Sequence, residues 1–208
     1  SPTLLLGGSV EDNLFQLPNL EEHLDLLKSV GGNYVRNTMS SRDSTNVWAF
    51  YFDEEKALYD LGKWNDEYWN RFEDFLKLTS ERDIIVQIEI WATFDFYRDF
   101  WSQNPFNPKN NINYSVDRVK LPEIVSTHPT LTENPFFWSI PLQRNNIRVL
   151  QYQQAFVDKL LSYSLKYGHV LYCIDNETSV TASWGQFWSD YIRKKGKEQG
   201  KKVYITEM

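Results

Sequence analysis

The 208-residue sequence lacks several features that mark common protein classes. It has a single cysteine, Cys173, so no disulfide can form within the chain. It contains no apolar run near the ~20 residues that a helix needs to cross a bilayer. It also does not open with the charged and then apolar segment of a signal peptide. We therefore expect no membrane span, and we expect any export signal to have been removed or to lie outside the chain.

The short motifs of nucleotide and metal chemistry are missing as well. No Gly-x-Gly-x-x-Gly follows the first expected strand, and neither a phosphate loop nor a Gly-x-Ser-x-Gly motif occurs. The three histidines, His23, His128 and His169, are too widely separated to show metal-ligand spacing. These absences predict that the protein uses no cofactor and binds no metal.

The 28 Asp and Glu outnumber the 22 Lys and Arg, and the formal net charge is −6. The one basic run, residues 193–202, ends an expected helix, where cations complement the helix dipole. Proteins that bind nucleic acid normally carry a basic face. Nucleic acid is therefore not an expected partner.

Aromatic residues are abundant by contrast, at 16% of the chain. Many of them stand in polar, loop-like stretches beside Asn, Asp and Gln. Flat rings can stack on the C–H faces of sugars while planar polar groups bind the hydroxyls, although the same residues also suit protein interfaces. The composition is thus compatible with a carbohydrate ligand.

Short apolar runs alternate with helical periodicities, which is typical of parallel β-α units. We expect strands at Thr3–Leu6, 34–36, 84–90, 170–174 and 203–206. We expect helices that start after Asn19 and Asn65, over 148–167 and after Ser183, with capping-box pairs at Asn19–Glu22 and Ser183–Gln186. This α/β order fits an open doubly wound sheet, and it also fits the N-terminal portion of a (β/α) TIM-type barrel.

We expect one incomplete barrel domain over residues 1–208, with a long loop insertion over residues 91–145. Its aromatic residues indicate a loop that walls a sugar cleft, or a small satellite core under a long loop. Trp91 is the favoured stacking platform because it stands at the end of a strand. Trp48, in the loop after the second expected strand, is a second candidate. A longer parent chain or a partner would supply the remaining strands.

In both architectures, chemistry takes place at the carboxyl ends of the parallel strands. Glu177 follows the fourth expected strand, with Asn176 directly before it. A carboxyl group in a partly desolvated site can protonate a leaving oxygen, and an amide can bind a substrate hydroxyl. The alternative is that Glu177 is an exposed loop acid without a catalytic role.

Arg36, at the end of the second expected strand, can fix a carboxylate bidentately. Glu89 shares strand parity with Gln87, so both side chains face the same side of the sheet. A buried carboxylate needs a partner, and Arg36 on the adjacent strand is the expected one. For Glu89 we favour a structural role.

Two segments carry a resemblance to a known family. The run from Gly32 to Arg36 resembles the second strand of clan A retaining glycoside hydrolases, which are cellulase-like (β/α)8 enzymes. The run Asp175-Asn176-Glu177 resembles the Asn-Glu that ends their fourth strand. The resemblance implies that Glu177 is the acid/base, that Asn176 binds a sugar hydroxyl, and that Arg36 supports the nucleophile.

The sequence therefore predicts a secreted or cell-surface glycosidase fragment that acts on a β-linked poly- or oligosaccharide by double displacement. The nucleophile would lie in the missing half, because Glu207 ends the wrong strand and is expected to be a subsite or structural residue. Two alternatives stay open: a catalytically inactive barrel that binds sugars, and an open α/β domain of unrelated function.

Overall fold

The computed structural model describes residues 3–128, 130–131 and 133–206. Its central sheet has four parallel strands in the order β1-β4-β5-β6. Their bounds are β1 (Tyr34–Thr38), β4 (Ile85–Trp91), β5 (Val170–Asp175) and β6 (Tyr204–Thr206). Because neighbouring strands are parallel, their carboxyl ends lie at the same edge of the sheet.

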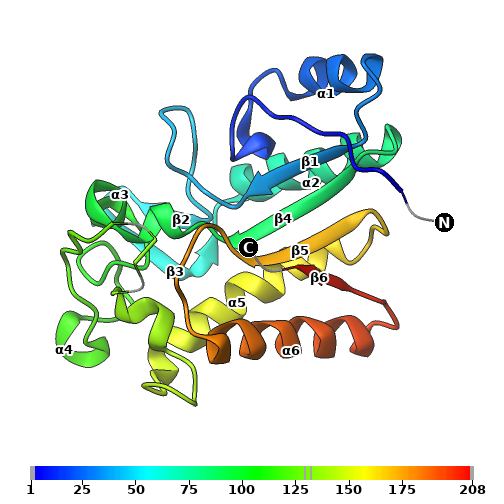
Figure 1. Ribbon diagram of the computed structural model, residues 1–208. Helices are drawn as coiled ribbons and strands as arrows, with labels where there is room; N and C mark the ends of the chain where they lie inside the picture. The colour runs from blue at the N-terminus through cyan, green and yellow to red at the C-terminus, as the bar shows by residue number, and fades with distance from the viewer. Residues whose placement is uncertain (1–2, 129, 132, 207–208) are drawn as a thin grey trace.

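Helices connect the strands, and Figure 1 shows α1, α2, α5 and α6 following one another from one edge of the sheet to the other. The α-helices are α1 (Leu20–Ser29), α2 (Asp66–Glu81), α3 (Arg98–Gln103), α4 (Val116–Val119), α5 (Ile147–Ser164) and α6 (Ala182–Glu198). Three 3₁₀ turns occur at η1 (Leu14–Gln16), η2 (Thr93–Phe96) and η3 (Pro135–Trp138). No helix in the described part of the chain has the length and apolarity needed to cross a membrane.

Helix α2 forms as its sequence predicts. The Asn65 side chain accepts a hydrogen bond from the backbone N–H of Glu67 at 3.1 Å and caps the helix. The apolar face buries Trp69, Phe72, Phe75 and Leu76. Spacing at three and four residues puts these side chains on one stripe that faces the sheet.

The predicted strand Thr3–Leu6 does not form. Only Gly7 bridges to Tyr34, in the parallel sense. The Asn33 side chain explains the difference, because it binds the N–H of Leu6 at 2.8 Å and the carbonyl of Leu4 at 2.9 Å. The Asn33 side chain thus forms hydrogen bonds with backbone groups that would otherwise pair with a neighbouring strand.

Both predicted capping boxes are wrong, although both helices exist. Asn19 precedes α1 but accepts no side-chain capping bond. Helix α6 starts earlier than predicted, because Thr181 caps it by accepting from the N–H of Trp184 at 3.4 Å. The end of α1 does follow prediction, since Gly31 has a φ of +84°, which glycine adopts without steric cost.

The segment between β1 and α2 was predicted to be a loop, yet it folds into a hairpin. Strands β2 (Phe50–Asp53) and β3 (Leu58–Trp64) pair antiparallel. An isolated bridge joins Tyr59 to Asn111, which lies in the long loop after β4. The hairpin therefore holds that loop in place from one side.

Candidate functional site

Polar and aromatic residues meet where β1, β4 and β5 end. Thr38 pairs in register with Glu89, and Glu89 pairs with Cys173. Trp91 pairs with Asp175, the last residue of β5. The segment that follows Asp175 thus leaves the sheet beside the ends of the neighbouring strands, which is where parallel-sheet enzymes bind their substrates.

The start of that segment is fixed by three hydrogen bonds. Asp175 is fully buried, and its Oδ1 accepts from Nε1 of Trp184 at 3.1 Å. The N–H of Asn176 donates to the carbonyl of Trp91 at 3.3 Å, and the Asn176 carbonyl accepts from Oγ1 of Thr93. Asn176 therefore holds a defined backbone position at the carboxyl end of the sheet.

Glu177 comes next and is exposed. Its φ of +45° is in the left-handed region, which costs a residue with a Cβ about 1–2 kcal/mol. Strained backbone of this kind occurs often at functional sites. The structure thus places the predicted acid/base on a turn that leads its side chain out of the core.

The side chain of Asn176 is only 4% exposed, and its Oδ1 is buried with no hydrogen-bond partner within the described residues. Oγ1 of Thr178 is also buried without a partner there. A buried acceptor left unpaired costs about 1–3 kcal/mol. Both atoms therefore have hydrogen-bonding capacity that the described residues do not use.

Arg36 and Glu89 form the predicted ion pair, with Nε and Oε1 2.6 Å apart. The Glu89 side chain is fully buried, while the Arg36 side chain is 41% exposed. The hydrogen bond to Glu89 raises the pKa of Arg36 above its ordinary value. Gln87 supports the pair by donating to Glu89 at 3.4 Å.

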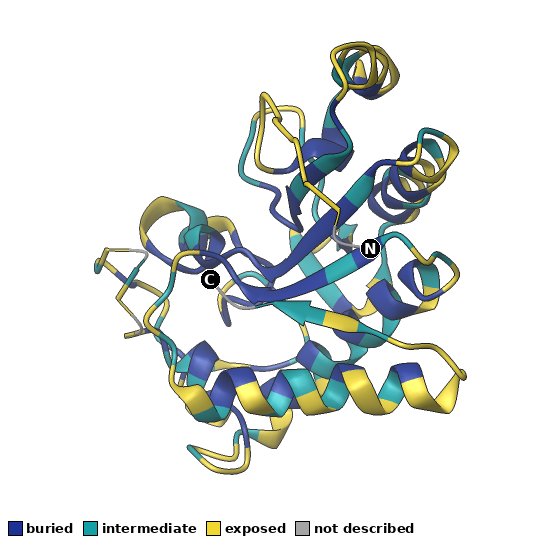
Figure 2. Ribbon diagram, turned by 45° about the vertical axis from the view of Figure 1, so that its right-hand side comes forward, coloured by how far each residue is buried: buried dark blue, intermediate teal, exposed yellow. Residues whose placement is uncertain are grey.

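Trp91 lies in the core, where its side chain is 1% exposed, and offers no free face to a sugar ring. It belongs to an aromatic cluster whose rings meet mostly edge-on or tilted. The aromatic cluster consists of Trp91, Phe96, Phe106, Phe136, Phe156, Trp184 and Trp188. Figure 2 shows the carboxyl ends of β1, β4 and β5 in the colour of buried residues. The long loop thus completes the main core, and Trp91 is a packing residue instead of the predicted platform.

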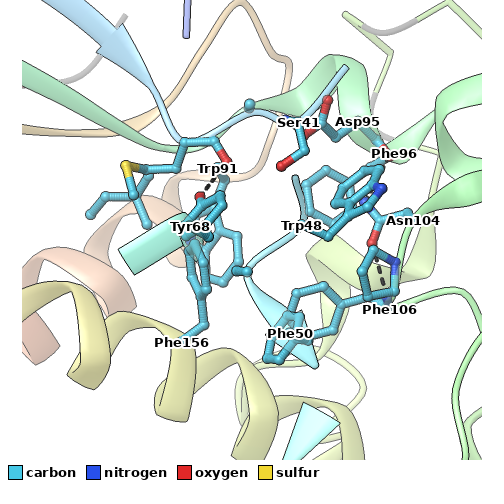
Figure 3. Close-up of a pocket in the computed structure, with 15 residues that line it drawn as sticks. Ser41, Trp48, Phe50, Tyr68, Trp91, Asp95, Phe96, Asn104, Phe106 and Phe156 are labelled. Atoms are coloured by element: carbon cyan, nitrogen blue, oxygen red, sulfur yellow. Dashed lines mark hydrogen bonds between the residues drawn. The ribbon is translucent and has the colours of Figure 1, made fainter. Parts of the chain in front are cut away.

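Trp48, the other predicted platform, is half-buried and lines a small cavity under the long loop. Figure 3 shows its ring with those of Phe96, Phe106 and Phe50 around this cavity. The cavity measures about 30 Å³, which is enough for one or two water molecules. Neither Asn176 nor Glu177 lines it, so it is separate from the candidate site.

Asp95, for which the sequence predicts no role, borders the same cavity. It is 4% exposed, and it accepts hydrogen bonds from Oγ of Ser40 at 2.8 Å and from the N–H of Ser41 at 3.2 Å. Burial raises the pKa of Asp95 to about 7, and the two hydrogen bonds only partly oppose this shift. Its position between Phe94 and Phe96 was the available sequence signal for a buried carboxyl group.

Glu207, the predicted subsite or structural residue, lies outside the described residues. In the part of the chain that is described, no group of three or more His, Cys, Asp or Glu is arranged to hold a metal ion. Cys173 is buried, and burial raises the pKa of its thiol to about 11, which keeps it protonated at neutral pH.

No family model matches the sequence, and no curated protein is similar to it. Solved structures do resemble the fold. An endo-1,4-β-mannanase from Rhizomucor miehei matches with a TM-score of 0.57 at 14% identity, over 95% of this chain and 54% of the mannanase. A glycoside hydrolase family 5 mannosidase from the same organism matches with a TM-score of 0.53 at 13% identity, over 88% and 44% of the two chains.

The chain therefore spans about half the length of the enzymes it resembles. At these identities the likeness concerns the fold. The sheet β1-β4-β5-β6 and its helices have the architecture of roughly half of a glycoside hydrolase family 5 barrel.

Proposed function

We propose that this chain is the acid/base half of a retaining glycoside hydrolase, with Glu177 as the proton donor. The observation that carries this proposal is the position of Asn176 and Glu177 directly after β5. With the Gly7 segment counted as the first strand, β5 is the fourth parallel strand of a half-barrel. The likeness of the fold to family 5 barrels supports a barrel over an open α/β sheet.

In the first step, Glu177 would protonate the glycosidic oxygen while a carboxylate from the remaining half attacks the anomeric carbon. The C–O bond to the leaving sugar breaks, and a covalent glycosyl-enzyme forms. Glu177, now ionised, would then take a proton from water as the water hydrolyses that intermediate. Retention of configuration requires the two carboxyl groups to lie ~5–5.5 Å apart.

Neighbouring residues would orient the substrate. The unpaired Oδ1 of Asn176 can accept a hydrogen bond from a sugar hydroxyl, which would satisfy a buried polar atom. Arg36 already neutralises the buried Glu89, and its half-exposed guanidinium could also hold the incoming nucleophile. Trp48 lines the separate cavity under the long loop, so the proposal gives it no part in orienting the substrate.

We propose a β-linked polysaccharide or oligosaccharide as substrate. β-Mannan is the first polymer to test, because the two similar structures are named a mannanase and a mannosidase. Since polysaccharides are too large to enter cells, we further propose that the protein acts outside the cell. Fractionation of the source culture, with the protein detected only inside cells, would contradict this localisation.

The test is reducing-sugar release from a panel of β-linked polysaccharides by the longest natural form of the protein. A Glu177→Gln variant should lose activity by about 10²–10⁴-fold, the range for removal of a general acid. Sugar binding should persist, because the amide keeps the shape of the side chain. Glu198→Gln, at the far end of α6, is the matched control and should retain full activity.

Equal turnover by the parent protein and Glu177→Gln would remove Glu177 from the mechanism. Sugar binding without turnover in either form would indicate a catalytically inactive sugar-binding barrel. The absence of both binding and turnover would contradict the proposed function.

A further inference from the structure

Four cations surround an open groove next to the candidate site. The groove lies between the end of α4 and the start of α5, and no acidic residue lines it. Its lining residues are Arg118, Val119, Lys120, Arg144, Asn145, Asn146, Ile147 and Arg148. We call it the basic groove. Such a concentration of positive charge is unexpected in a chain with a net charge of −6.

The four cations of the basic groove lack acidic partners. Elsewhere in the molecule, cations such as Arg36, Arg82 and Lys195 form ion pairs at 2.6–2.9 Å. None of the four groove cations forms an ion pair with any residue that the structure describes. Uncompensated like charges close together repel one another. An anion in the groove would relieve this repulsion.

A side-chain hydrogen bond joins the two segments that form the groove. Nδ2 of Asn146 donates to the carbonyl of Val119 at 2.6 Å, which joins the start of α5 to the end of α4. The first turn of α5 contains no acid, so the partial positive charge of this helix end adds to the field of the cations. The cations therefore stand on a fixed frame.

The groove also continues toward Glu177. Arg144 lines both the basic groove and a second hollow, which Trp138, Gln143, Ser179 and Thr181 complete. Gln143 donates to Oγ1 of Thr181 at 2.9 Å, so this hollow borders the same loop that carries Glu177. In Figure 1, this loop descends from the end of β5 to α6 beside the segment between α4 and α5.

The hollow itself has surfaces suited to a sugar. The Arg144 guanidinium lies over the Trp138 ring, 4.3 Å from its centre, and the half-buried ring forms one wall. Oε1 of Gln143 is buried and has no hydrogen-bond partner among the described residues. The hollow thus combines an aromatic wall with residues of the loop that carries Glu177, and the positive charge of the basic groove adjoins it at Arg144.

We infer that the basic groove binds an anionic group carried by the polysaccharide substrate, so that the enzyme prefers acidic over neutral chains. This inference rests on the proposed function, because it assigns a substrate class to the same site. Guanidinium groups bind carboxylates and sulfates through two parallel N–H···O hydrogen bonds. The groove would hold the charged substituent while the neutral backbone of the chain passes Trp138 toward Glu177.

The test compares three soluble cellulose derivatives that share one backbone. Carboxymethyl cellulose carries carboxylates, cellulose sulfate carries sulfate esters, and hydroxyethyl cellulose is neutral. Affinity is measured by calorimetry in 50 mM and 300 mM NaCl, concentrations that change the screening of exposed charges. We expect at least one anionic polymer to bind about 10-fold more tightly than the neutral polymer at low salt, a difference of ~1.4 kcal/mol.

The variant Arg118→Gln/Arg148→Gln removes two groove cations and leaves Arg144 on Trp138. It should lose most of the preference for the anionic polymer, together with most of its salt dependence. The matched control is Lys77→Gln/Lys194→Gln, which removes two exposed cations whose acidic neighbours are 4.0 Å away on α2 and α6. This control should bind like the unmodified chain.

Whether carboxymethyl cellulose or cellulose sulfate binds more tightly identifies the anionic group, and either result supports the inference. Equal binding of neutral and anionic polymers would overturn it, and so would an equal loss in the control variant. Single-stranded DNA that binds as tightly, with the same loss in the groove variant, would overturn it in favour of a nucleic-acid surface.

The addition of β-mannan to this panel separates the inference from the proposed function. If the longest natural form cleaves β-mannan through Glu177 but shows no preference for anionic chains, the groove inference fails and the function stands. If the groove binds anionic chains but no polymer is cleaved through Glu177, the function fails and the groove remains a binding site.

Discussion

The aromatic cluster and the loop 176–181 adjoin each other at the carboxyl end of the sheet, yet they differ in how they are stabilised. The rings of the cluster pack mostly edge-on or tilted, and several of them line the small cavity beside Trp48. In the loop, Asn176 and Thr178 each have a buried polar atom without a partner in the described part of the chain, and the backbone is strained at Glu177. Trp184 connects the cluster to the residue directly before the loop, since it packs on Trp91 and donates to Asp175.

The contrast indicates which residues stabilise the fold and which are available to a ligand. In sequence, an aromatic residue at the end of a strand resembles a sugar platform. In the structure, rings from the long loop, from α5 and from α6 pack around Trp91. The unpaired polar atoms follow β5 directly. Three substitutions test this contrast. One lies in the aromatic cluster, one at the border of the cluster, and one in the loop 176–181.

The largest effect is expected from Phe136→Ala in the aromatic cluster. Phe136 is fully buried and packs against Trp91, Phe96 and Phe106, so the change leaves a cavity that the rigid neighbours cannot fill. The free energy of unfolding should fall by about 3–5 kcal/mol, as measured by urea denaturation. Leu142→Ala, at a position 83% exposed, is the control and should cost less than about 0.5 kcal/mol. A loss below about 1 kcal/mol in Phe136→Ala would show that the cluster is loosely packed.

A smaller and pH-dependent effect is expected at Asp95, on the border of the aromatic cluster. Burial raises its pKa to about 7, so between about pH 4 and pH 7 the unfolded chain is ionised while the folded protein keeps the proton. The free energy of unfolding should therefore fall as the pH rises through this window, by about 2–4 kcal/mol from this group. Above pH 7 the contribution should be constant.

The measurement is urea denaturation of the parent chain and Asp95→Asn at pH 4.5 and pH 8. The difference between the two proteins isolates Asp95, because the other carboxyl groups are common to both. Asp95→Asn should lose less stability than the parent as the pH rises. Identical pH dependence in both proteins would contradict the raised pKa.

The parallel strands β1, β4, β5 and β6 and the long helices between them could be predicted from sequence, because apolar runs and helical stripes reflect burial directly. The stripe of Phe72, Phe75 and Leu76 in α2 and the apolar run of β5 show this. The run Thr3–Leu6 is equally apolar, but pairing depends on the Asn33 side chain, which competes for the same backbone groups. Local sequence contains no signal for such a long-range competitor.

Part of the candidate site could likewise be predicted from the sequence, and part could not. The position of Asn176 and Glu177 after a strand could be read from the sequence, and so could the Arg36–Glu89 pair, because strand order and parity fix them. The burial of Trp91 could not be predicted, since it depends on how the long loop folds back. The basic groove was also missed, because its cations come from two segments more than twenty residues apart.

The smallest effect is expected from Glu177→Gly, which tests the strained backbone of the loop 176–181. Glycine adopts a φ of +45° without the steric cost of a Cβ, so the free energy of unfolding should rise by about 0.5–1 kcal/mol. Ala57→Gly is the matched control, because Ala57 is exposed in the hairpin turn with a φ of +52°. Both variants should be stabilised in urea denaturation, but only Glu177→Gly should lose reducing-sugar release in the longest natural form. A loss of stability in Glu177→Gly with a gain in Ala57→Gly would mean that the Glu177 side chain stabilises the fold, and Glu177 would then be a structural residue.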